Sequence, residues 1–194
     1  EKVFFDPPRI DIKSGDTVHL ETGTHLMGRM VPGADIDDWM KWFKEVIDKT
    51  SETYFFPDEI TDSKKVRKGA GHHHLTGPIY IEEAEAGDIL QVEILDIDPG
   101  PYGFNLNPET SFVNLGLLKE DYPKGKVRWY YVNRKDMTFE FQPGIKIPIR
   151  PFPGTIGVEL PEKGMWSNVP PGRHGGNLDN KDLVAGTVLY LPVW

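Results

Sequence analysis

A short stretch near the end of the sequence gathers several residues that could do chemistry. It reads Arg173-His174-Gly175-Gly176-Asn177-Leu178-Asp179 and stands before an apolar segment. Glycine has no side chain, so a glycine pair lets the backbone come close to a neighbouring group. Polar side chains held on a turn beside a rigid strand are a common way to build a site. The stretch therefore predicts a site just before the last strand.

The residue types in this stretch suggest two roles. Asp179 could act as a general base or as a ligand of a hard metal ion. Asn177 and the amides of Gly175 and Gly176 could hold a carbonyl oxygen. The alternative is a tight turn in which Asn and Asp bond their own backbone. That alternative explains less well why Arg173 and His174 stand alongside.

A second candidate is the run His72-His73-His74, which stands before a short apolar segment. Imidazole is a good metal ligand and a good acid–base group near neutral pH. Neighbouring side chains on an extended chain point to opposite faces, so the three cannot all bind one ion. At most one or two of them face a site. The other interpretation is a solvated histidine tract that enters a strand.

Asp16, His19 and His25 are weaker candidates near the start of the chain. Asp16 belongs to a Ser-Gly-Asp turn, His19 is expected on the solvent face of a strand, and His25 falls in a loop. Elsewhere the sequence contains no nucleophile elbow, no phosphate-binding glycine loop and no paired-histidine helix.

Composition restricts the class of fold and of partner. The 194 residues include 20 glycines and 17 prolines, which favours short strands and turns. A net charge of -8 argues against nucleic acid or an anionic membrane as a partner. No apolar run reaches membrane-spanning length, so we expect a soluble protein. The absence of cysteine excludes thiolate chemistry but leaves the compartment, cytoplasmic or periplasmic, open.

The expected elements are mostly strands. One helix is predicted near residues 36–48, where apolar residues recur at helical spacing and Asp35 or Asp37 can cap the first turn. Alternating or apolar patterns predict strands on both sides of residues 14–16, and at 78–81, 90–94, 127–131, 137–141, 145–149, 155–158 and 187–193. Residues 133–136 predict a β-hairpin. The prediction is a mainly β protein, a sandwich or barrel with one inserted helix.

Four segments resemble the acetamidase/formamidase family, in the family's order. They are His73–Glu82, Ala84–Ile97, Pro153–Val158, and Gly172–Asp179 continued to Val193, which includes the Gly-Gly-Asn-x-Asp signature. We therefore interpret residues 1–194 as an acetamidase/formamidase-like region, in which residues 1–72 match only loosely. Family members continue past this last strand into a segment rich in Gly, Asp, His and Glu. We expect the region to be incomplete at its C-terminus.

The resemblance implies a β-rich, homo-oligomeric hydrolase that converts small linear amides, such as formamide or acetamide, to the acid and ammonia. Because the sequence has no cysteine and no serine motif, we favour water activated by a carboxylate or a divalent metal, zinc or calcium, over an acyl-enzyme. The expected catalytic residues are Asp179, His73 and Asn177. Gly175, Gly176 and His174 are expected to bind substrate, and His73 and Asp179 to hold any metal.

Two other functions are weighed against this one. A β-sandwich with exposed aromatic residues could be a non-catalytic binding or assembly module, for instance for carbohydrate, with Trp129, Tyr130 and Trp166 as stacking platforms. A family-like protein that has lost its activity is the third possibility.

The last apolar segment carries a prediction of its own. Residues 187–194 form a strongly apolar strand pattern that ends in Trp194. An uncovered strand edge of this kind is a liability in soluble proteins. We therefore predict that the partner of this strand lies outside the 194 residues, in a C-terminal segment or a second chain, and that Val188, Tyr190 and Trp194 contact it.

Overall fold

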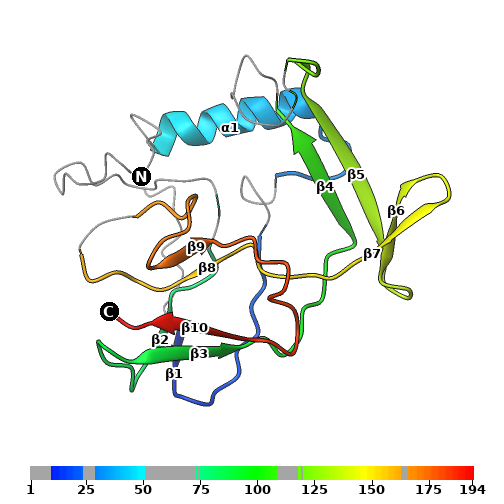
Figure 1. The fold of residues 1–194 in the computed structure, drawn as a ribbon. Coiled ribbons are helices and arrows are strands. Elements are labelled where there is room, and N and C mark those ends of the chain that lie inside the picture. Colours follow the sequence, from blue (N-terminus) through cyan, green and yellow to red (C-terminus); the bar gives the residue numbers. More distant parts are fainter. Residues whose placement is uncertain are drawn as a thin grey trace.

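A computed structural model describes residues 10–23, 29–50, 73, 75–108, 118, 120–162 and 166–194, with helix side chains as far as Glu45. In these residues ten strands and one helix make up a mainly β fold, as predicted (Figure 1). The described strands form four separate sheets, and none of them closes into a barrel. The part of the chain that the structure covers includes no helix long and apolar enough to cross a bilayer.

The predicted helix is confirmed as α1, Ile36–Thr50. Its first turn is capped by Asp35, whose Oδ1 accepts hydrogen bonds from the amides of Asp37 and Asp38 at 2.9 and 3.0 Å. One face carries Trp39 and Phe43, both buried, with stacked rings whose centroids are 4.7 Å apart. This apolar face, predicted as core from its spacing, holds the helix on its sheet.

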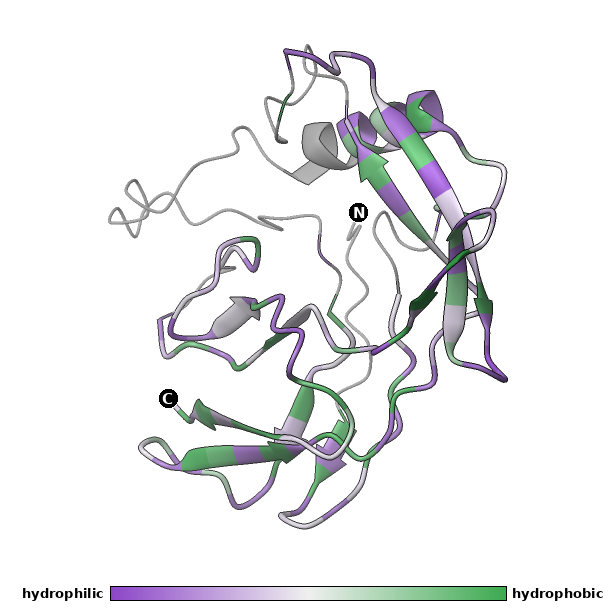
Figure 2. Ribbon diagram, turned by 45° about the vertical axis from the view of Figure 1, so that its right-hand side comes forward, coloured by the Kyte–Doolittle hydropathy of each residue, from purple (hydrophilic) through white to green (hydrophobic). Residues whose placement is uncertain are grey.

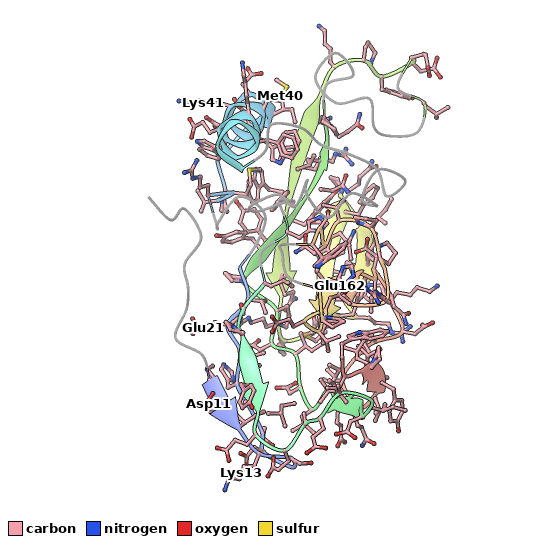
Figure 3. All side chains as sticks on the ribbon, turned by 90° about the vertical axis from the view of Figure 1, so that its left-hand side faces the viewer. Asp11, Lys13, Glu21, Met40, Lys41 and Glu162 are labelled. Atoms are coloured by element: carbon pink, nitrogen blue, oxygen red, sulfur yellow. The ribbon has the colours of Figure 1, made fainter. Side chains whose placement is uncertain are left out.

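That sheet contains β4 (Tyr102–Asn107), β5 (Lys126–Asn133), β6 (Thr138–Gln142) and β7 (Ile145–Pro148), in this order. The helix lies across β4 and β5 (Figure 1). Trp129 of β5 packs against the helix core, and its indole Nε1 donates to the carbonyl of Ala34 at 2.9 Å. Figure 3 looks along the helix, with Met40 against this core and Lys41 exposed.

The hairpin predicted at residues 133–136 is confirmed, because β5 pairs with β6 through Val132↔Phe139 and Asn133↔Thr138. Strand β4 was not predicted. Its apolar side chains alternate correctly, but glycine and asparagine fill the other positions and weaken the strand signal.

The remaining strands form three pairs. One pair is parallel and joins β1 (Ile10–Ile12) to β2 (Ile79–Ile81). The other two are antiparallel: β3 (Ile89–Glu93) pairs with β10 (Val188–Pro192), and β8 (Thr155–Gly157) pairs with β9 (Gly175–Asn177). The strand expected after residues 14–16 is wrong: the turn is present, but residues 16–20 are irregular. Strand β1 ends at Ile12, whose carbonyl accepts a hydrogen bond from the amide of Glu82. None of the described strands pairs with residues 16–20.

The prediction for the last strand also needs correction. Strand β10 finds a partner inside the chain, because it pairs with β3 along its whole length and buries Leu191. Trp194 likewise contacts its own chain, since the guanidinium of Arg173 lies 4.9 Å from its ring centroid. Val188 and Tyr190 remain 40% and 61% exposed on the outer face. Figure 2 shows apolar residues along both strands of this pair.

Candidate active site

Two strands approach so closely at the candidate site that only glycine fits. Gly157 of β8 stands opposite Gly175 of β9. A Cβ atom on Gly157 would overlap the carbonyl oxygen of His174, and one on Gly175 would overlap that of Ile156. Gly175 and Gly176 also have φ of +92° and +93°, which side chains disfavour. The glycine pair therefore brings backbones together, as predicted, although within a short strand.

Asp179 and Asn177 direct oxygen atoms over Gly154. A Cβ built on Gly154 would lie 3.2 Å from Asp179 Oδ1 and 4.0 Å from Asn177 Oδ1. The amide of Asp179 donates to the carbonyl of Gly154 at 3.1 Å. Asp179 itself has φ of +45°, a conformation that Asp tolerates better than most residues. Gly154 thus lies directly against the oxygen atoms of two of the predicted catalytic residues.

The carboxamide of Asn177 is oriented by Thr155. The Thr155 hydroxyl donates to Asn177 Oδ1 at 3.2 Å, across the pair of strands β8 and β9. With its oxygen engaged, the carboxamide keeps its NH₂ group as a donor. Such a donor could hold a carbonyl oxygen.

Asn168 joins the histidine segment to this turn. Its Nδ2 donates to the carbonyl of His73 at 2.8 Å, although the two residues are 95 positions apart. Its own carbonyl accepts from the amide of Asn177, also at 2.8 Å. Sequence patterns gave no sign of Asn168, because both contacts use main-chain atoms of its partners.

His73 and Asp179 belong to one electrostatic environment. Burial lowers the pKa of His73 below its ordinary 6.5, while the Asp179 carboxylate and a hydrogen bond with the Asn168 backbone act in the opposite direction and raise it. The net direction is downward. A neutral imidazole close to a carboxylate is therefore the favoured state near pH 7. His72 and His74 lie outside the described residues.

The other predicted substrate-binding residues lie inside the turn. Gly175 and Gly176 are buried, and the amide of Gly175 donates to the carbonyl of Gly172 at 2.9 Å. The ring of His174 lies across two glycines: a Cβ on Gly172 would stand 3.0 Å from it, and one on Gly176 3.1 Å from Nε2. These contacts give all three residues a part in shaping the turn, and their contact with substrate stays a prediction.

Arg173 makes its side-chain contacts with residues outside this polar cluster. Its guanidinium bonds the Glu162 carboxylate and covers the Trp194 ring. Glu162 is labelled in Figure 3, and the hydrogen bond from Arg173 is the main cause of its lowered pKa. Arg173 thus connects the turn to the end of β10.

The described side chains do not by themselves make a metal site. His73 and Asp179 offer two ligands, whereas catalytic zinc is held by three protein ligands and calcium by six to eight oxygens. No group of three or more His, Asp or Glu side chains suited to a metal ion occurs in the described ranges. We therefore derive no chemical step through a metal.

Two of the aromatic residues expected as stacking platforms, Trp129 and Tyr130, pack against other side chains. Trp129 lies against the helix, and Tyr130 packs on Phe139 and Phe141 with centroids 4.9 and 6.0 Å away. Trp166 is half-buried, and its Nε1 donates to the carbonyl of Glu162. Trp129 and Tyr130 also line a pocket together with Tyr131 and Phe139, so the binding-module alternative stays a prediction.

The weaker candidates near the start of the chain do not join the site. Asp16 accepts a hydrogen bond from the Lys13 amide at 2.8 Å, as a turn residue does. His19 is exposed, as expected, and His25 lies outside the described residues.

Comparison with known proteins identifies the group to which this fold and site belong. A sequence model described as the Acetamidase/Formamidase family matches residues 34–168. The chain belongs to the acetamidase/formamidase family. A formamidase of Methylophilus methylotrophus is 26% identical over 175 residues, 63% of this chain and 42% of the relative. An acetamidase of Mycolicibacterium smegmatis is 31% identical over 98 residues, 50% of this chain and 24% of the relative.

Solved structures agree with this assignment. An acetamidase from Bacillus halodurans superposes with a TM-score of 0.54 at 37% identity, over 60% of this chain and 37% of that one. A gamma lactamase from Delftia acidovorans gives a TM-score of 0.69 at 22% identity, over 95% of this chain and 51% of that one, and shows the shared fold. The chain spans less than half the length of the curated relatives that it matches.

Proposed function

We propose that the protein hydrolyses the C–N bond of small linear amides, such as formamide or acetamide, and releases ammonia. The observation that carries the proposal is the convergence of Asp179, Asn177 and the His73 segment around Gly154 and Asn168. Relatives named formamidase and acetamidase support the same substrate class.

In the proposed reaction Asp179 is the general base. Its carboxylate takes a proton from a water molecule as the water oxygen attacks the amide carbon. The NH₂ group of Asn177 donates to the carbonyl oxygen, which gains negative charge in the tetrahedral intermediate. The protonated Asp179 then returns the proton to the leaving nitrogen, and the C–N bond breaks to give the acid and ammonia.

His73 stands beside Asp179 in this scheme. Its lowered pKa keeps the imidazole neutral near pH 7, so that it does not hold Asp179 in a fixed ion pair. Asp179 then keeps its carboxylate available to accept the proton of water. Gly154 has no side chain that would cover the oxygen atoms of Asp179 and Asn177.

The test is ammonia release from formamide, acetamide and a longer amide by the full-length protein, with and without a chelator. We expect turnover of at least one of the two short amides. Activity that survives chelation supports water activated by Asp179 alone, and activity lost on chelation but restored by zinc or calcium would assign activation to a metal. No turnover of any short amide under either condition would contradict the enzyme proposal and favour the inactive alternative.

Assembly is a separate part of the proposal. Val188 and Tyr190 remain exposed on the outer face of β10, next to exposed Ile89 of β3. We expect this face to be covered by a further segment or by a second copy in a homo-oligomer. Light scattering of the full-length protein tests the second case, and Tyr190→Lys should then lower the measured mass.

A further inference from the structure

We propose that Asn168 is a positioning residue, which sets the separation between the His73 segment and the Asn177–Asp179 turn. This inference rests on the proposed amide hydrolysis. Asn168 is not within the four segments that carry the family resemblance, and no chemistry of its own has been assigned to it.

The first step of the argument is connectivity. Asn168 Nδ2 donates to the His73 carbonyl at 2.8 Å, and the Asn168 carbonyl accepts from the Asn177 amide at 2.8 Å. One residue therefore holds the main chains of two predicted catalytic residues. Both of these hydrogen bonds are made to main-chain atoms of His73 and Asn177, so they fix the two backbones.

The second step is enclosure. The carbonyl of Asn168 would stand only 3.3 Å from a Cβ on Gly176, so Asn168 packs directly onto β9. Its Oδ1 is buried and has no hydrogen-bond donor among the described residues. A buried carboxamide that leaves one atom unpaired calls for an explanation. The hydrogen bond from Asn168 Nδ2 to the His73 carbonyl explains why a carboxamide stands here, because an apolar side chain of the same shape could not make that hydrogen bond.

The third step is the expected consequence. Replacing Asn168 with Asp keeps the shape but sets a carboxylate oxygen against the His73 carbonyl. The two oxygens repel, and the His73 segment moves away from the turn. A displacement of about 1 Å at a catalytic group can lower turnover about 100-fold. Substrate contacts made by the turn itself remain, so KM should change little.

The experiment compares four proteins: the wild type, Asn168→Asp, His73→Gln and the double variant. We expect Asn168→Asp to lower kcat about 10- to 100-fold with KM within about twofold. In the His73→Gln background the Asn168→Asp change should lower kcat by less than about twofold, because the effects of substitutions at residues that act as a unit do not add. Equal losses in both backgrounds would overturn the proposal.

A second readout does not require activity. The ring signals of His73 in the NMR spectrum, assigned by their loss in His73→Gln, should shift in Asn168→Asp. The matched control is Asn105→Asp, the same change at an exposed position of β4, which should leave the ring signals and kcat unchanged. Unchanged His73 signals in folded Asn168→Asp would overturn the positioning role.

These readouts separate the two proposals. If the wild type hydrolyses no amide, the proposed function fails and the ring signals alone decide the role of Asn168. If Asn168→Asp does not fold, Asn168→Ser, which shortens the side chain without adding charge, takes its place in both comparisons.

Discussion

The helix with its sheet and the β8–β9 pair are held together in different ways. Helix α1 covers β4 and β5 with large side chains, above all Trp39 and Phe43. Strands β8 and β9 meet through glycines, and their backbones leave no room for a Cβ atom. The first region can exchange one apolar side chain for another of similar volume, whereas the second tolerates no added atom. The candidate site lies on the second.

The largest change in stability is expected from Trp39→Ala in the helix region. Removing a buried indole should lower the free energy of unfolding by about 3–5 kcal/mol. Lys41→Ala, on the exposed side of the same helix, should change it by less than about 0.5 kcal/mol. Urea denaturation measures both. Because the helix is remote from the turn, turnover per folded molecule should stay unchanged, and a large loss in Trp39→Ala would break the separation of the two regions.

Gly157→Ala tests the second region. The added methyl group meets the backbone of His174, which cannot rotate away. We therefore expect the free energy of unfolding to fall by about 1–3 kcal/mol or more. Turnover should fall as well, because β9 must shift and carries Asn177 with it. The control is Gly103→Ala in β4, where a Cβ meets nothing within 4 Å. Equal stability of the two variants would show that the contact is not tight.

The pH dependence of stability distinguishes the regions further. The folded protein holds the pKa of His73 below 6.5, so the unfolded chain binds the proton more readily. Stability should be greatest above pH 6.5 and fall as the pH drops from 6.5 through the folded value. In Asp179→Asn the pKa of His73 should drop further and the loss should grow. Denaturation at pH 8 and pH 5 measures this loss, which should be absent in His73→Gln.

The smallest effect is expected from Arg173→Gln. The change removes the ion pair with Glu162 and the contact with Trp194, both of which are partly exposed. A cation–π contact at an exposed site stabilises by about 0.5–1 kcal/mol. The contact with Arg173 lowers the pKa of Glu162. The contribution of this ion pair to stability should therefore be present above about pH 4.5 and disappear as the Glu162 carboxylate takes up a proton. Thermal unfolding at pH 7 and pH 4 checks both statements.

The helix region is the part of the fold that the sequence predicted best. The recurrence of Trp39 and Phe43 and the alternation along β5 each report a buried face directly. Strand β4 escaped detection because Gly103 and Asn105 interrupt its pattern. The strand expected at residues 16–20 is wrong because a favourable composition does not supply a pairing partner.

The site was predicted through residue types more than through structure. The glycine pair indicated a close approach, but only the fold reveals Gly157 as its counterpart, because the two segments are distant in sequence. Asn168 and Thr155 were missed because they act on main-chain atoms or on a single carboxamide. Such contacts leave no periodicity in a sequence.

The most direct test of the account is the turnover of formamide and acetamide by the full-length Asp179→Asn variant, measured as released ammonia. Asn keeps the shape of the side chain but cannot accept the proton, so we expect kcat to fall about 10²- to 10⁴-fold with stability nearly unchanged at pH 8. Asp182→Asn, the same change at an exposed position three residues further on, should keep wild-type turnover. Wild-type turnover by folded Asp179→Asn would contradict the assignment of the base and, with it, the central claim.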